Sequence, residues 1–177
     1  MPNIINKELK ELSLLGLTHE LVLKLFSYND EVGNLIWIAK INPKQNIGDI
    51  AGRVNYHRKR RDISIGGIRY KSTHIIWLYK TGTLPTSLID HINRNSLDDR
   101  WSNLREANYS QNACNSSLRV NSSSGIKGLS WCNTYSKWRG VIYCNEKAYS
   151  KVHFDKTTVI TWLQESRLRL HGKFANE

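Results

Sequence analysis

The chain has 177 residues, 40% of them hydrophobic, and a formal net charge of +11. This length suits one ordinary domain or two small ones, and no stretch approaches the roughly 20 apolar residues of a membrane helix. No apolar run opens the sequence, which predicts no signal peptide. The three cysteines form no CxxC pair, and their odd number argues against a disulfide framework or a structural zinc site. We therefore expect a reduced, cytoplasmic protein with no membrane partner.

The positive charge is unevenly distributed along the chain. Residues 1–52 hold five Lys/Arg and six Asp/Glu, residues 53–118 hold eleven and five, and residues 119–177 hold ten and four. A basic surface interleaved with aromatic side chains suits a phosphate backbone. A generally basic domain without such a partner has the same composition, so the charge alone leaves both interpretations open.

The first 85 residues predict helices and short strands. Thr18 is the expected cap of a helix that begins HELVLKLF, with Leu21 and Leu25 at helical spacing. The other predicted elements are a turn at 28–33, a strand at 35–39, a loop at 42–52, a hairpin of 62–64 and 68–71 around Gly66 and Gly67, and a helix capped by Ser72 or Thr73 and ended by Gly82.

A basic cluster lies within this part of the chain. Arg58, Lys59, Arg60 and Arg61 are consecutive and follow Arg53 closely. Four adjacent cations repel one another unless an anion is near. The cluster is therefore either a phosphate contact or a solvated loop.

Residues 88–115 carry the strongest chemical signal, LIDHINRNSLDDRWSNLREANYSQNACN, and predict a strand, a polar loop, a second strand at 103–107 and a helix at 109–116. Asp90 offers a carboxylate and Asn112 an amide oxygen, ligands that suit Mg²⁺ or Mn²⁺. His91 points away from Asp90 on a regular strand and has the chemistry of a general base. Asn103 either orients the His91 ring or holds the loop.

The last third predicts a linker at 121–125, then strands at 128–131, 137–144 and 148–154. Thr157 or Thr158 is the expected cap of a helix at 159–171. These elements predict a small three-stranded antiparallel sheet packed on one helix. A unit of this size is marginally stable alone.

The central motif closely resembles the HNH (His-Me finger) endonuclease family, whose ββα-metal site has this layout. The resemblance implies Asp90 and Asn112 as ligands of one divalent ion, Mg²⁺ or Mn²⁺, His91 as general base and Asn103 as support. The preceding STHIIWLYKTGTLP resembles the segment before the motif in phage HNH proteins. In this segment, His74 has three possible roles: it contacts DNA, it supports the site, or it is a core histidine.

The segment SSGIKGLSWCNTYSKWRGVIYCNEKAYSKVHFD resembles the Apetala/ethylene-response-factor-like DNA-binding domain, whose sheet lies in the major groove. Arg105 of the central motif is a further candidate for DNA contact. Trp138 is also a candidate for the core between sheet and helix. The DNA contacts that the second resemblance implies are Lys127, Trp131, Lys137, Trp138, Arg139 and Lys151.

We therefore expect an α+β protein in which an N-terminal region (1–52) and an HNH nuclease core (53–120) precede a DNA-binding domain (121–177). Its expected activity is metal-dependent cleavage of double-stranded DNA, of the phage homing type, in the host cytoplasm. One alternative is a DNA-binding protein with a vestigial nuclease site, and another is a restriction or defence nuclease. One active centre per chain leaves monomer and homodimer open.

Overall fold

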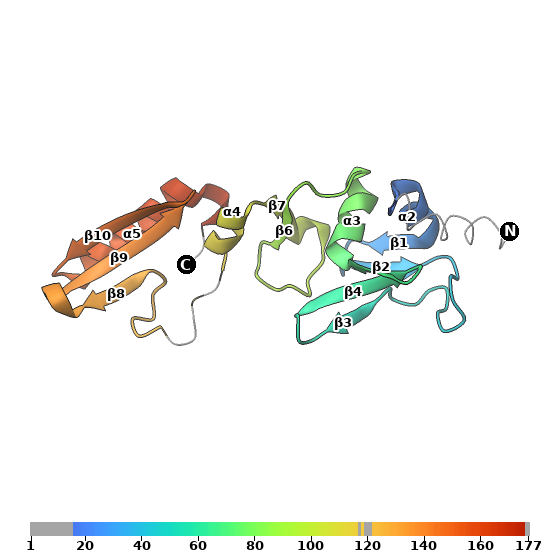
Figure 1. The fold of residues 1–177 in the computed structure, drawn as a ribbon, viewed down its shortest axis with the longest axis horizontal. Coiled ribbons are helices and arrows are strands. Elements are labelled where there is room, and N and C mark those ends of the chain that lie inside the picture. Colours follow the sequence, from blue (N-terminus) through green and yellow to red (C-terminus); the bar gives the residue numbers. More distant parts are fainter. Residues whose placement is uncertain (1–15, 117, 119–121, 176–177) are drawn as a thin grey trace. The chain divides into compact units, whose positions relative to one another are not determined.

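The structure, a computed structural model, describes residues 16–116, 118 and 122–175 (Figure 1). The chain divides into two compact units, Met1–Glu106 and Ala107–Glu177. Within the described residues, no helix combines the length and apolar character that crossing a membrane requires.

The described part of the first unit, residues 16–106, contains two helices, two hairpins and a small sheet. Strands β1 and β2 pair antiparallel, β3, β4 and β5 form a three-stranded sheet in that order, and β6 pairs with β7. In chain order the elements are α2 (His19–Leu25), β1 (Phe26–Asn29), β2 (Asn34–Trp37), β3 (Arg53–Asn55), β4 (Arg60–Ile65), β5 (Ile68–Lys71), α3 (Ser72–Thr81), β6 (Leu88–His91), the 3₁₀ turn η1 (Trp101–Asn103) and β7 (Leu104–Ala107).

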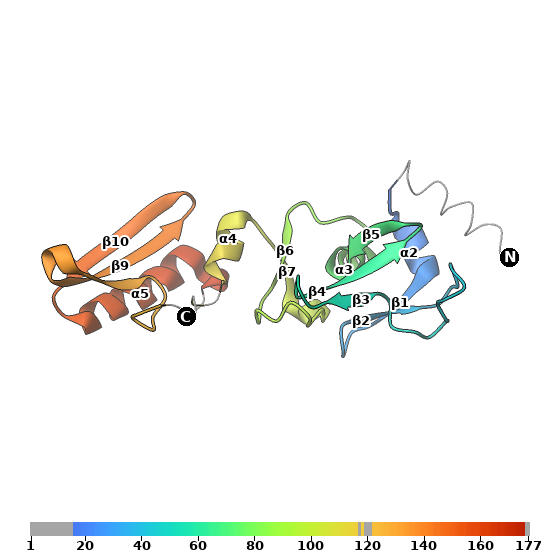
Figure 2. The same ribbon diagram turned by 60° about the horizontal axis from the view of Figure 1, so that its bottom comes forward.

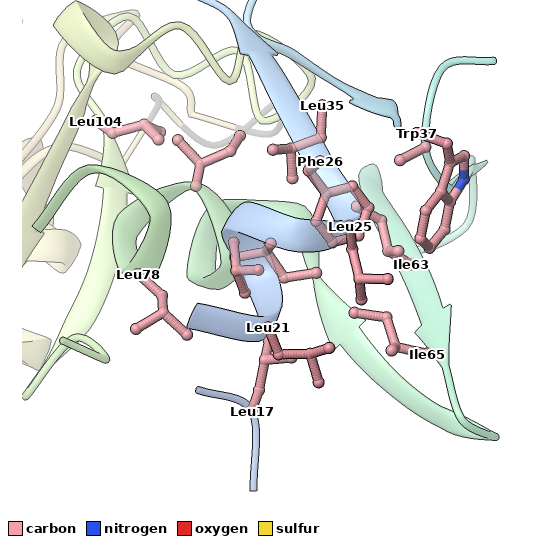
Figure 3. Packing of buried hydrophobic residues seen from close by; sticks show 14 residues of the cluster. Leu17, Leu21, Leu25, Phe26, Leu35, Trp37, Ile63, Ile65, Leu78 and Leu104 are labelled. Atoms are coloured by element: carbon pink, nitrogen blue, oxygen red, sulfur yellow. The ribbon is translucent and has the colours of Figure 1, made fainter. Parts of the chain in front are cut away.

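One hydrophobic core holds these elements together (Figure 3). Strand β4 alternates buried Ile63, exposed Ser64 and buried Ile65, as a strand with one buried face should. Leu104 extends the core to β7 and thereby anchors the β6–β7 hairpin. The labelled members in Figure 3 are Leu17, Leu21, Leu25, Phe26, Leu35, Trp37, Ile63, Ile65, Leu78 and Leu104.

The first unit differs from the predicted elements in three places. Phe26 begins a strand instead of continuing the helix, because its ring packs against Trp37 across the β1–β2 hairpin, with centroids 4.4 Å apart. Arg53–Asn55, for which no element was predicted, is a strand that pairs with β4. Lys71, without a side-chain cap, precedes α3. Ser72 does not cap the helix because its hydroxyl donates to Asp99.

The second unit is a helix followed by a sheet that packs on a longer helix. The sheet has the order β10-β9-β8 with antiparallel pairing, and Figures 1 and 2 both show α5 running along β9 and β10. Its elements are α4 (Tyr109–Cys114), β8 (Leu129–Cys132), η2 (Asn133–Tyr135), β9 (Lys137–Cys144), β10 (Lys147–His153), α5 (Lys156–His171) and η3 (Gly172–Phe174).

The core of this sheet is small and tightly closed. Leu129 and Ile142 pack from the strands against Val159 and Leu163 of α5. Gly140 lets the helix approach, because a Cβ there would lie 2.8 Å from the Val159 Cγ1. The predicted antiparallel sheet with one covering helix is therefore present.

Two details of the second unit differ from expectation. Asp155, and neither Thr157 nor Thr158, caps α5, because its carboxylate accepts from the backbone of both threonines. The compact units divide after Glu106, whereas the predicted linker was 121–125. Residue 121 of that linker lies outside the described residues. The three-domain division stays a prediction.

Candidate active site

The β6–β7 hairpin encloses a polar loop that Asn103 holds in place. The Ile92 amide donates to the Asn103 carbonyl oxygen at 2.9 Å. The buried Asn103 side chain accepts from the Asn93 amide at 2.9 Å and donates to the Asp98 carbonyl at 2.7 Å. Of the two roles considered for Asn103, these hydrogen bonds describe the one that holds the loop.

His91, the last residue of β6, contacts an acidic side chain of this loop. Its Nε2 lies 2.9 Å from Oδ1 of Asp99, and both side chains are largely buried. An ionised carboxylate only accepts hydrogen bonds, so this contact is a hydrogen bond when Nε2 carries the proton. In the neutral form of that tautomer, Nδ1 is the basic nitrogen of the ring.

Asp99 is itself held by elements far away in the sequence. The hydroxyl of Ser72, at the start of α3, donates to Oδ2 of Asp99 at 2.5 Å. The Tyr28 hydroxyl of β1 donates to the Asp99 carbonyl at 2.8 Å. Burial raises the pKa of Tyr28 to about 12, so this phenol keeps its proton at neutral pH. Helix α3 and the β1–β2 hairpin therefore both fix the loop that faces His91.

Asp90 forms an ion pair with the next strand. Its side chain is 6% exposed, and the Nε and Nη2 atoms of Arg105 both lie 2.8 Å from its Oδ2. Opposite charges at this distance and depth attract strongly, because water screens them poorly. Arg105, predicted as a DNA contact, therefore neutralises the predicted metal ligand in this structure.

The chemistry of the donors suits a hard divalent cation. Asp90 offers a carboxylate oxygen and Asn112 an amide oxygen, which are ligands that Mg²⁺ and Mn²⁺ prefer. Asn112 is exposed on α4 and belongs to the second unit, whereas Asp90 belongs to the first. Among the described residues, no group of three or more His, Cys, Asp or Glu side chains could hold a metal ion.

The structure brings the basic cluster to the polar loop. The turn between β3 and β4, residues 56–59, places its tip against that loop, where the Ser96 hydroxyl donates to the Lys59 carbonyl. Arg58 and Lys59 are exposed in this turn. Arg60 pairs with Asp62 at 2.8 Å, which offsets part of its charge. Arg61 is partly buried on β4, so Arg58 and Lys59 are the more open cations of the four.

His74 lies half-buried on α3, within the first unit. Burial, together with the positive charges of Lys71 and Arg60, lowers the pKa of its imidazole. The ring is therefore neutral at physiological pH. Its proposed contact with DNA stays a prediction.

The predicted DNA contacts of the second unit fall on both faces of its sheet. Residues opposite each other in an antiparallel pair share a face. Arg139 and Lys137 alternate along β9 with Trp138 and Gly140, which face α5, so both cations point away from the helix. Lys151, opposite Gly140, belongs to the helix side.

Three further candidates have contacts within the second unit. The Lys127 ammonium donates to the carbonyls of Cys114 and Ser116 at 2.7 Å and closes the end of α4. Trp138 packs against the core beside α5. Trp131, 47% exposed, meets the Trp138 ring edge-on with centroids 5.2 Å apart. These contacts are structural, and DNA binding by the three residues stays a prediction.

Asp99 was missed by sequence reasoning, together with its supports Ser72 and Tyr28. Two adjacent carboxylates, Asp98 and Asp99, follow His91 in the loop. Asp98 turns toward the Arg100 guanidinium, which lowers the pKa of Asp98 to about 2, whereas Asp99 turns inward to His91. An acidic pair shortly after a candidate base was the available signal, but it did not say which carboxylate turns inward.

Comparison with known proteins bears on the same segment. A family described as HNH endonuclease matches residues 70–114. The chain is 36% identical over 101 residues to "Protein 3.8" of Escherichia phage T7, an alignment that covers 56% of this chain and 84% of that protein. No solved structure matches the chain.

Proposed function

Since this chain belongs to the same family as Protein 3.8 of Escherichia phage T7 and carries an HNH endonuclease domain at residues 70–114, we propose that it cleaves DNA with His91 as the general base. The observation that carries this proposal is the contact between His91 and the buried Asp99 within the matched segment. A histidine paired with a carboxylate in this way is oriented for proton transfer.

Each chain residue at the site has a chemical task in this proposal. Nδ1 of His91 takes a proton from a water molecule while the water oxygen attacks phosphorus and the bond to the leaving oxygen breaks. Asn103 holds the loop in its conformation through side-chain hydrogen bonds to the backbone of Asn93 and Asp98. Asp99 contacts the other ring nitrogen, Nε2, at 2.9 Å.

We further propose that Asp90 holds one divalent ion, Mg²⁺ or Mn²⁺, and that Asn112 is its second protein ligand, as the family resemblance implies. Such an ion, when bound, stabilises the charge at the phosphorus and at the leaving oxygen. Arg105 competes for the Asp90 oxygen, with both contacts at 2.8 Å. Its guanidinium suits a DNA phosphate equally well, so we propose that it exchanges the carboxylate for phosphate when DNA binds.

Double-stranded DNA is the proposed substrate, and two basic regions would bind it. Arg58 and Lys59 are exposed in the turn that the loop residue Ser96 contacts, which places cations near the site. Lys137 and Arg139 lie on the open face of the second sheet. Cations at these positions would contact phosphates, which position a protein on DNA without reading its sequence.

We also propose that the nuclease is of the phage homing type. Its second unit is proposed to be an Apetala/ethylene-response-factor-like DNA-binding domain. The loop, Asp90, His91 and Asn103 keep a full set of contacts. A vestigial site would not need a buried carboxylate aimed at its histidine, so this set speaks for an active nuclease. A restriction or defence role uses the same chemistry and differs only in the DNA that is cut.

Cleavage of supercoiled DNA tests the proposal. Purified full-length protein is incubated with supercoiled plasmid and phage DNA in Mg²⁺, in Mn²⁺ and in EDTA. We expect open circles or linear DNA with either metal and intact supercoils in EDTA. Cleavage at an equal rate in EDTA would refute the metal dependence, and binding without cleavage on every DNA would favour the vestigial site.

A further inference from the structure

Asp99 is a buried carboxylate whose contacts converge on His91. Its residue is 2% exposed, which is costly for a charged group unless hydrogen bonds replace the lost water. Ser72 supplies one donor to Oδ2 and His91 another to Oδ1, so each carboxylate oxygen has its own partner.

The adjacent Asp98 serves as a comparison, because the contacts of its carboxylate lie within the loop. It lies nearer the surface and accepts hydrogen bonds from Asn93 and from the Arg100 guanidinium, both within the loop. Asp99 makes neither contact. Its partners come from β6 and α3, so its carboxylate links the histidine to the core of the first unit.

The backbone of Asp99 is fixed as firmly as its side chain. Tyr28 donates to its carbonyl, and Gly33 of the β1–β2 turn presses against the peptide that follows it. A Cβ at Gly33 would lie 2.5 Å from the Asp99 carbonyl carbon and 2.3 Å from the Arg100 nitrogen. The fixed backbone and the Ser72 hydrogen bond to Oδ2 together hold the carboxylate beside His91, where it favours one orientation of the ring.

We propose that Asp99 is a positioning residue that fixes the His91 ring in the Nε2–H tautomer and so presents Nδ1 as the nitrogen that takes the proton. The consequence for cleavage rests on the proposed function. The tautomer itself is a property of the folded chain and is tested without DNA.

The test is ¹⁵N NMR of the histidine ring nitrogens in the full-length protein. Protonated and unprotonated ring nitrogens have well separated ¹⁵N shifts, and His91→Gln identifies the His91 signals among the six histidines. Spectra are taken at about pH 8.5, where an ordinary imidazole is neutral. We expect a single Nε2–H tautomer in the unmodified protein. An Nδ1–H ring would overturn the assignment, and this reading needs no variant at Asp99.

Asp99→Asn and Asp98→Asn form a matched pair of variants, because each removes one carboxylate charge from adjacent positions. The amide at position 99 can offer His91 either an acceptor or a donor, so we expect both tautomers in Asp99→Asn and only Nε2–H in Asp98→Asn. Cleavage by Asp99→Asn should slow at least tenfold. An unchanged tautomer in a folded Asp99→Asn protein would overturn the proposal.

The two proposals fail separately. If the tautomers behave as expected and neither the unmodified protein nor the variant cuts any DNA, the nuclease function is rejected and the positioning of His91 by Asp99 is supported. If the unmodified protein cuts DNA and the ring is Nδ1–H, the nuclease stands and the role of Asp99 is rejected.

Discussion

The ion pair of Asp90 and Arg105 joins stability to metal binding within a single pair of residues. Both side chains are at most 12% exposed, so removing one partner takes away an ion pair that water screens poorly and leaves the other charge in a buried place. We predict that Asp90→Asn abolishes cleavage and lowers the free energy of unfolding by about 3–5 kcal/mol. Chemical denaturation monitored by Trp fluorescence measures the second effect.

The double variant Asp90→Asn/Arg105→Gln separates the two effects. It removes both charges, so most of the lost stability should return, whereas cleavage should not. Cleavage by a refolded double variant would show that the Asp90 carboxylate does not hold the metal. An unchanged stability of Asp90→Asn alone would show that Arg105 finds another partner in the folded chain.

At the scale of elements, the β1–β2 turn controls a loop that lies far from it in the sequence. Gly33 has φ +72°, a conformation that L side chains rarely adopt, and no space for a Cβ beside Asp99 and Arg100. We predict that Gly33→Ala destabilises the protein by at least 1 kcal/mol and slows cleavage, because the Asp99 backbone must shift.

The matched control is Gly67→Ala, in the β4–β5 turn. Gly67 has φ +84°, so alanine is strained there too, but a Cβ would meet nothing within 4 Å. Melting temperatures and cleavage rates of both variants should be compared. Equal cleavage by the two, at equal loss of stability, would show that the turn acts on stability alone.

The elements also show what the sequence could predict. Thr18 caps α2, and Gly66 and Gly67 join β4 to β5, because caps and tight turns are local signals. The strand at Phe26 and the role of Ser72 were not predictable in this way, because both depend on partners distant in the sequence, Trp37 and Asp99. Asp90, His91 and Asn103 could be singled out because their short motif carries the chemistry itself, and their roles stay predictions.

For the whole molecule, part of the proposed DNA binding belongs to the open face of the second sheet, where Lys137 and Arg139 lie. We predict that Lys137→Gln/Arg139→Gln lowers the slope of log K against log salt by about 1.8, because each phosphate contact contributes about 0.9. Fluorescence anisotropy with duplex DNA at several salt concentrations measures the slope.

The control removes the same charge elsewhere in that unit. Arg169 is exposed on α5 and Lys173 on η3, at the C-terminal end of the helix. Arg169→Gln/Lys173→Gln should leave the slope within about 0.5 of that of the unmodified protein. If both double variants lower it equally, the unit attracts DNA through its net charge and the sheet has no special part.

The role of His91 as general base is tested by measuring cleavage and DNA binding side by side for His91→Ala. We predict that the variant nicks supercoiled DNA in Mg²⁺ at least a thousandfold more slowly, while its Kd for the same DNA in EDTA stays within about twofold, because His91 acts on the water and does not anchor the duplex. Cleavage by His91→Ala at a rate near that of the unmodified protein would contradict the assignment of His91 as the general base.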